Sequence, residues 1–372
     1  MTKNICQIIG YFNQGNAQYY MKRVMMKNFS NKEYNFNLLI QNNMRFIYTK
    51  NYLGNNKNVF FFNNNTELAL LIKKMDYLIL SIDLNGWWKC IHDFDQKKIY
   101  YIGHGITNHF INDTMMDRLF VNFRKSPINF LLFCKKQYEY LVKHKKNVFK
   151  IGTLPQIDNL LCKSSKTSDI LIVEGTDNWS IYGERINQYR SNIFNLLTNN
   201  FQDVSIYYKG AWGDNASVVN RLVRQYTNIK NITRDKCLAY DYFFCDIIIC
   251  IHFTTTFLEA LLNNSKAILI TFDFLHNVDI TQPGMKERGW LLPAFVEFKT
   301  ELYPNLLVAH DFPTLIKHIN TIKTIPNYFE TEDYSRDKNQ YIKDSIGEYV
   351  PNISKQIIDI IEKNELNISL NK

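Results

Sequence analysis

Residues 245–273 read CDIIICIHFTTTFLEALLNNSKAILITFD, and this stretch decides the fold. It begins with an apolar run of strand length, continues with apolar residues at helical spacing, and ends with a second apolar run. A strand, a helix and a strand in this order predict two parallel strands joined by a right-handed crossover. The stretch therefore predicts a parallel sheet that is covered by helices.

The same alternation runs on both sides of a short polar linker, SSKTS at residues 164–168. Strand patterns such as YLILSID and KIYYIGHG precede the linker, and DILIVEGT and DVSIYYKG follow it among helical patterns. We therefore predict an α/β protein with two Rossmann-like domains, residues 1–163 and residues 169–350, whose parallel sheets face each other across a cleft. The amphipathic helix within residues 351–372 is expected to pack back on the first domain.

Composition excludes several classes of protein. The 372-residue chain has no run of about 18 uncharged apolar residues, so we expect no transmembrane helix. The start, MTKNICQIIGYF, lacks the small-residue cleavage site of a secretory signal. The seven cysteines show no CxxC spacing, which predicts reduced cysteines in a cytoplasmic protein and neither a disulfide framework nor a zinc site.

Charge is unevenly distributed along the chain. Residues 1–165 hold 23 Lys and Arg against 10 Asp and Glu, whereas residues 166–372 hold 21 against 25. The densest basic stretch, CKKQYEYLVKHKKNVFK, is either a solvated helix face or a peripheral contact of the N-terminal domain with the anionic inner face of a membrane or a phosphate-bearing polymer. Nucleic acid is not an expected partner, because no helix-turn-helix, RNP motif or zinc finger is present.

A histidine between two glycines ends one predicted strand. The strand KIYYI leads into Gly103, His104 and Gly105, and ligands of parallel sheets bind beyond the carboxyl ends of the strands. The glycines allow a sharp turn close to a ligand, and an imidazole titrates near neutral pH. His104 is therefore a candidate general base, and a loop histidine that bonds to backbone remains the alternative.

Three consecutive threonines follow another predicted strand. Thr254, Thr255 and Thr256 open a helix in which Glu259 lies one turn further along. Free N–H groups, the helix dipole and several hydroxyl groups together favour phosphate, and the Glu259 carboxylate could accept from a ribose hydroxyl. An N-cap with a first-turn acid is the alternative, although it explains only one of the threonines. No GxxxxGK[ST] is present, which excludes a P-loop NTPase.

A third strand end, IGTLPQIDNLL, carries a turn from Pro155 to Asp158. The order of these features resembles the GT-B superfamily and, within it, the CDP-glycerol:polyglycerophosphate glycerophosphotransferases, the teichoic-acid polymerase group. The resemblance covers roughly residues 95–365. It rests on Gly103-His104-Gly105, Leu154-Pro155-Gln156-Ile157-Asp158, Cys245-Asp246, His252-Phe253-Thr254-Thr255 with Glu259, and Glu287-Arg288-Gly289-Trp290.

The sequence departs from the family pattern at three places. Lys209 and Gly210 stand where the family has a second histidine, His252 replaces an aspartate, and the arginine after Pro155 is absent. These departures leave open whether the donor is linked to CDP, CMP or UDP.

The resemblance implies a transferase that uses a nucleotide-activated donor. It implies donor phosphates at Thr254, Thr255 and Thr256, the ribose near Glu259, and leaving-group charge offset by Arg288 or Lys209, with His252 beside them. The His104 imidazole would remove the proton of an acceptor hydroxyl on a surface glycan, a polyol-phosphate polymer of the teichoic-acid type or a lipid-linked acceptor.

No cofactor or metal is expected, since only Asp93 and Asp95 resemble a metal-binding pair and they precede a strand. Two alternatives stay open. The chain could be a non-catalytic nucleotide- or glycan-binding protein on the same scaffold, or an enzyme like the UDP-sugar 2-epimerases.

Overall fold

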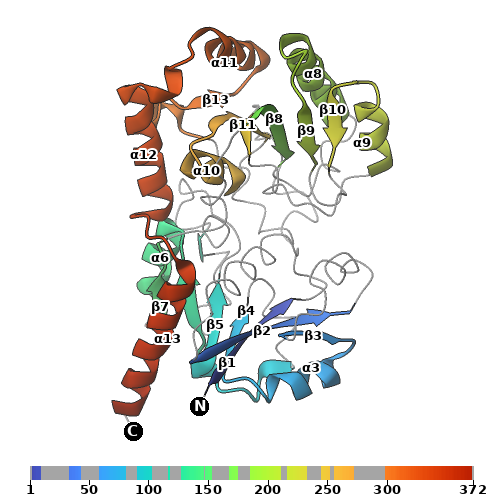
Figure 1. Cartoon of the computed structure of the whole chain (residues 1–372). Coiled ribbons are helices and arrows are strands. Elements are labelled where there is room, and N and C mark those ends of the chain that lie inside the picture. Colours follow the sequence, from blue (N-terminus) through green and yellow to red (C-terminus); the bar gives the residue numbers. More distant parts are fainter. Residues whose placement is uncertain are drawn as a thin grey trace. The chain divides into compact units, whose positions relative to one another are not determined.

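The computed structural model (Figure 1) separates into two compact units. Unit 1 comprises Met1–Ile106, Phe120–Asn159 and Ile346–Lys372, and unit 2 comprises Thr107–Leu119 and Leu160–Ser345. The residues that the structure describes are 2–9, 33–42, 58–80, 90–102, 116–117, 127–145, 147–152, 167–174, 185–210, 216–232, 244–251, 255–271 and 298–370.

Unit 1 is built on a seven-stranded sheet in the order β3-β2-β1-β4-β5-β6-β7, and all its strand pairs are parallel. Its strands are β1 (Lys3–Ile9), β2 (Tyr34–Gln41), β3 (Val59–Phe62), β4 (Tyr77–Leu80), β5 (Ile99–Ile102), β6 (Asn129–Leu132) and β7 (Val148–Lys150). Its helices are α3 (Asn65–Ile72), α6 (Lys135–Val142) and α13 (Ile353–Leu370), with a 3₁₀ turn at Gln96–Lys98. The strand order reverses between β1 and β4, as in Rossmann-like sheets.

Unit 2 repeats this plan with six parallel strands in the order β10-β9-β8-β11-β12-β13. Its strands are β8 (Thr167–Glu174), β9 (Ile206–Lys209), β10 (Ile229–Asn231), β11 (Cys245–Ile251), β12 (Lys266–Ile270) and β13 (Leu307–Ala309). Its helices are α8 (Arg185–Asn200), α9 (Ala216–Val223), α10 (Thr255–Leu262), α11 (Phe312–Thr324) and α12 (Glu332–Ile346), with 3₁₀ turns at Thr300–Leu302 and Tyr328–Glu330. The two sheets confirm the predicted α/β class with two Rossmann-like parallel sheets.

The two faces of the unit 2 sheet are covered by different helices. Alternate residues of β8, such as Ile170 and Ile172, pack in one apolar cluster with Phe194 of α8 and Leu315 of α11. Figure 1 shows α10 on the opposite face, where it packs on β11 and β12. Because side chains alternate along a strand, each strand residue can be assigned to the α8 face or to the α10 face.

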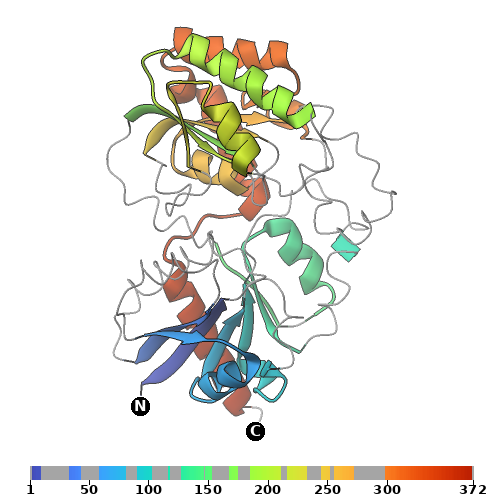
Figure 2. The same ribbon diagram turned by 90° about the vertical axis from the view of Figure 1, so that its right-hand side faces the viewer.

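The C-terminal helix α13 lies along the unit 1 sheet (Figure 2). Asn364 donates to Asn129 Oδ1 at 3.0 Å and to the Tyr100 hydroxyl at 3.2 Å. The hydroxyl of Tyr34 on β2 donates to Glu362 at 3.0 Å. These contacts join the last helix to strands that are more than 200 residues away in sequence.

A close backbone approach holds the chain just before α13. The Val350 N–H donates to the Gly152 carbonyl at 2.8 Å, and the Gly152 N–H donates to Gln356 Oε1 at 2.8 Å. A Cβ atom at position 152 would lie 2.6 Å from Val350 Cβ and 2.9 Å from its backbone nitrogen. Only glycine therefore fits at this position without displacing the chain.

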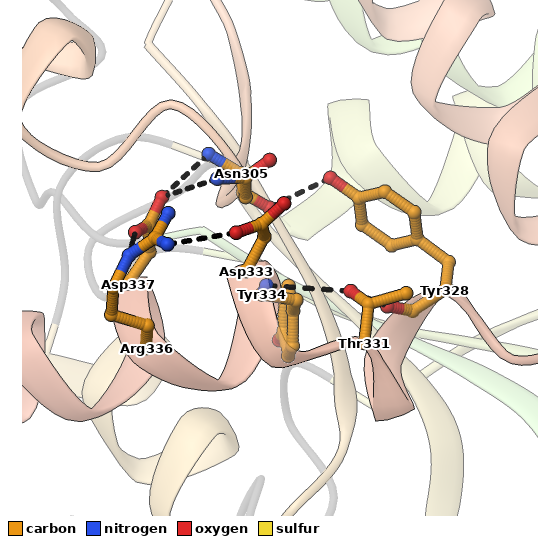
Figure 3. A network of polar contacts seen from close by, with 7 residues as sticks. All are labelled: Asn305, Tyr328, Thr331, Asp333, Tyr334, Arg336 and Asp337. Carbon is orange, nitrogen blue, oxygen red and sulfur yellow. Dashed lines mark hydrogen bonds and ion pairs between the residues drawn. The ribbon is translucent and has the colours of Figure 1, made fainter.

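A polar network anchors α12 to the segment that precedes β13 (Figure 3). The buried Asp337 carboxylate accepts from the backbone N–H of Asn305 at 2.8 Å and from its side-chain amide at 2.9 Å. The Asn305 carbonyl in turn accepts from the Tyr328 hydroxyl at 2.8 Å. At the helix start, the Tyr334 N–H donates to Thr331 Oγ1, and Arg336 pairs with Asp333 at 2.7 Å.

Sequence reasoning missed β10, β13, α11 and α12. A signal for α11 was present, because Asp311 caps its start by accepting from the Thr314 N–H at 2.8 Å and Pro313 follows in the first turn.

Across the described part of the chain, no helix combines the length and apolarity needed to cross a bilayer.

Candidate functional site

The carboxyl ends of the unit 2 strands form one row. Glu174 of β8 pairs with Ile251 of β11, Ile251 pairs with Ile270 of β12, and Ile270 pairs with Ala309 of β13. Since all the strands are parallel, their carboxyl ends share one edge of the sheet. The strand order reverses between β8 and β11, which is where ligands of open α/β sheets bind.

Helix α10 begins at this row. Thr255, its first residue, follows the end of β11 by four positions and is partly exposed, whereas Thr256 is buried. The first four N–H groups of an α-helix have no partner within the helix, and the dipole adds partial positive charge there. The structure therefore places Thr255 and the start of α10 at the switch point of the sheet, the place between β8 and β11 where the strand order reverses.

Glu259 lies deeper, on the buried side of α10. Its exposed fraction is 0%, and it lies near Cys250 of β11. Burial and the nearby Glu259 carboxylate both raise the pKa of the Cys250 thiol well above its usual value. Glu259 is thus held between helix and sheet in this structure, and its contact with a ribose stays a prediction.

Lys209 reaches the same edge and the same face as α10. Its neighbour Tyr208 and Ile206 belong to the apolar cluster on the α8 face, so alternation places Lys209 on the α10 face. Lys209 is the last residue of β9, pairs in register with Val173 of β8, and is partly exposed. The structure thereby brings a predicted phosphate-neutralising residue to the edge where α10 starts.

Thr271 and His310 are two edge residues that sequence reasoning missed. They follow the last residues of β12 and β13, and Thr271 Oγ1 lies 3.0 Å from His310 Nδ1. Ile270 and Ala309 face the α8 side, so Thr271 and His310 lie on the α10 side. Their sequence signal is a polar residue directly after an apolar run.

A buried ion pair occupies the other face of this edge. Arg190 of α8 donates to both carboxylate oxygens of Glu174, at 2.8 and 2.7 Å, and to Asn187 Oδ1 at 3.0 Å. The Glu174 and Arg190 side chains are 0% and 4% exposed. Sequence reasoning did not single out this pair, which fixes the end of β8 to α8.

The remaining candidates lie outside the described residues, and their roles stay predictions. They are Gly103, His104, Gly105, Pro155, Asp158, His252, Thr254 and Arg288.

The two aspartates considered for a metal have other contacts. Asp93 pairs with His92 at 2.9 Å, and Asp95 accepts from the Lys97 N–H at 3.0 Å. Within the ranges that the structure describes, no three His, Cys, Asp or Glu side chains gather as metal ligands would.

Comparison with known proteins gives matches among solved structures only. No family model matches the sequence, and no curated protein matches it. The wall teichoic acid polymerase TagF, in a variant form, aligns with a TM-score of 0.64 at 12% identity over 98% of this chain and 90% of that chain. A UDP-GlcNAc 2-epimerase from Neisseria meningitidis bound to UDP-GlcNAc aligns with a TM-score of 0.54 at 12% identity, over 97% of this chain and 100% of that chain. A glycosyltransferase from Rickettsia africae aligns with a TM-score of 0.52 at 12% identity, over 98% of each chain.

These likenesses extend over nearly the whole chain at an identity that shows the fold alone. They confirm the predicted GT-B type of fold, in which one chain holds two Rossmann-like units.

Proposed function

We propose that the chain is a transferase that moves a glycosyl or glycerophosphoryl group from a nucleotide-activated donor to an acceptor hydroxyl. One observation carries the proposal. The start of α10, with the partly exposed Thr255, lies at the switch point of a GT-B-type sheet on the same face as Lys209. N–H groups, a hydroxyl and an ammonium group together favour a phosphate.

In this proposal the nucleotide phosphates bind at the start of α10. As the bond from the transferred group to the phosphate oxygen breaks, negative charge grows on the leaving nucleotide. The α10 dipole and Lys209 stabilise that charge, which lowers the barrier to transfer. The likeness in fold to a UDP-GlcNAc 2-epimerase that is bound to UDP-GlcNAc supports a nucleotide-linked donor. CDP, CMP and UDP are the nucleotides to be tested.

The acceptor half of the proposal rests on His104. Its imidazole takes the acceptor hydroxyl proton while the acceptor oxygen bonds to the transferred carbon or phosphorus and the nucleotide departs. We expect His104→Ala to abolish transfer while UDP or CDP binding is kept. Transfer rates equal to those of the wild type would remove the general-base role from His104.

Nucleotide binding is the first test of the proposal. We expect CMP, CDP or UDP to raise the melting temperature of the wild-type protein, because a ligand that binds only the folded state stabilises it. In calorimetry, Thr255→Ala should weaken the binding of that nucleotide. Thr324→Ala, at the exposed end of α11, should leave the binding unchanged. If none of the three nucleotides changes the melting temperature, the proposed donor site is wrong.

Product analysis then separates the transferase from its alternatives. CDP-glycerol, CMP-linked and UDP-linked sugars are each incubated with and without a glycan or polyol-phosphate acceptor. Nucleotide release that depends on the acceptor supports transfer. Conversion of a UDP-sugar without an acceptor would favour an epimerase, which the fold of the Neisseria meningitidis enzyme makes the second candidate. Tight binding with neither outcome would favour a binding protein.

A further inference from the structure

Thr271 directly follows β12, His310 directly follows β13, and hydrogen bonds connect these two strand ends. The Thr271 N–H donates to the Ala309 carbonyl at 2.8 Å, and the Thr271 hydroxyl lies 3.0 Å from His310 Nδ1. Thr271 is 1% exposed, so a buried hydroxyl holds the ring of a partly exposed histidine. In the described part of the chain, the Nε2 atom of His310 has no hydrogen-bond partner.

The position of His310 relates it to α10. Ile251, Ile270 and Ala309 lie in one row, and neighbouring strands are about 4.8 Å apart, so the end of β13 is roughly 10 Å from the end of β11. Helix α10 packs on β11 and β12, and its start lies at the carboxyl edge because the chain enters the helix from the end of β11. His310 and the first turn of α10 thus lie at the same edge and on the same face of the sheet.

We propose that His310 is a second ligand of the nucleotide phosphates, with Thr271 as its positioning residue. The inference rests on the proposed function and adds a specific residue to the donor site. A Thr271 hydroxyl that donates to Nδ1 selects the tautomer with the proton on Nε2. The Nε2–H then donates to a phosphate oxygen, and such charge-assisted hydrogen bonds are stronger than neutral ones.

A purely structural role would need only the Nδ1 contact, which ties β12 to β13. The two roles can be separated because an asparagine amide reaches the place of Nδ1 and a glutamine amide reaches the place of Nε2. His310→Asn keeps a polar group for Thr271 and removes the group that meets the phosphate. His310→Gln keeps a donor near the Nε2 position and removes the Nδ1 atom that contacts the Thr271 hydroxyl.

The test measures UDP and CDP binding by calorimetry, with uridine and cytidine as probes that lack phosphate. We expect His310→Asn to bind the nucleoside diphosphate roughly tenfold to a hundredfold more weakly, since it loses one hydrogen bond to a charged group. Its nucleoside binding and melting temperature should stay close to those of the wild type. His310→Gln should recover part of the loss, and Thr271→Val should show a smaller loss.

His92→Asn is the matched control, because His92 is an exposed histidine of unit 1 that pairs with Asp93. If wild-type protein binds UDP or CDP and His310→Asn binds it equally well, His310 is not a phosphate ligand although the proposed function stands. If His310→Asn weakens the binding of the nucleoside and of the nucleoside diphosphate to the same degree, the assignment of His310 as a phosphate ligand is also overturned. Failure of the wild type to bind any nucleotide would overturn the proposed function itself.

Discussion

The Arg190 guanidinium holds the Glu174 carboxylate through two hydrogen bonds of 2.8 and 2.7 Å, at the end of the strand next to the switch point. Both charges are almost completely withdrawn from water. Such a pair contributes little net stability compared with an apolar pair, but either charge alone is costly to bury. The pair therefore fixes the geometry of β8 and α8 beside the candidate donor site.

Removing one member of this pair should be strongly destabilising. We expect Arg190→Met to lower the free energy of unfolding by about 3–5 kcal/mol, because the Glu174 carboxylate remains buried without its cation. The double variant Glu174→Met with Arg190→Met should recover most of that loss. Urea unfolding measures both values, and a double variant no more stable than Arg190→Met would contradict this account.

The network of Figure 3 allows a comparison of two aspartates on one helix. Asp337 is 4% exposed and accepts two hydrogen bonds from Asn305, whereas the Asp333 side chain is 67% exposed. We expect Asp337→Ala to cost about 2–4 kcal/mol, because the Asn305 donors lose a charged acceptor. Asp333→Ala should change stability little. Equal effects in urea unfolding would show that the Asp337 contacts do not anchor α12.

The contact of α13 with the unit 1 sheet predicts a role for Asn364. Its amide supplies the hydrogen bond to Asn129 Oδ1, and Asn129 is 2% exposed. We expect Asn364→Ala to destabilise the protein by about 1–3 kcal/mol, the cost of leaving a buried acceptor unsatisfied. Lys363→Ala, at the exposed neighbouring position, is the control. The melting temperatures of the two variants should differ clearly if α13 is part of the folded unit.

His318 predicts a loss of stability on acidification. Burial lowers its pKa from the ordinary imidazole value, although its Nε2–H donates to the Val308 carbonyl at 3.0 Å. Below about pH 6.5 the unfolded chain therefore takes up a proton that the folded protein binds less readily, so stability falls as the pH falls. His318→Gln keeps an amide donor near Nε2 and does not titrate.

Urea unfolding at pH 7.5 and pH 5.5 checks this effect. The wild type should lose more stability between the two values than His318→Gln. The same loss in both proteins would show that His318 does not contribute to the acid sensitivity.

Local sequence pattern determined the two parallel sheets and the beginning of α10. Apolar runs of strand length and helical spacing are short-range properties, so CDIIICIHF and TTTFLEALL predict β11 and α10 from their own residues. Short elements with weaker patterns, β10 and β13, gave no such signal. They form because the longer strands beside them provide hydrogen-bonding edges.

Only the tertiary structure decided which polar residues meet. Lys209, Thr271 and His310 are separated by 62 and 39 residues in sequence, and strand order and register bring them to one edge and one face of a sheet. The Glu174–Arg190 pair and the contacts of α13 arise in the same way. Pairing between distant segments depends on how whole strands and helices pack together, and the periodicity of a single segment holds no information about its neighbours.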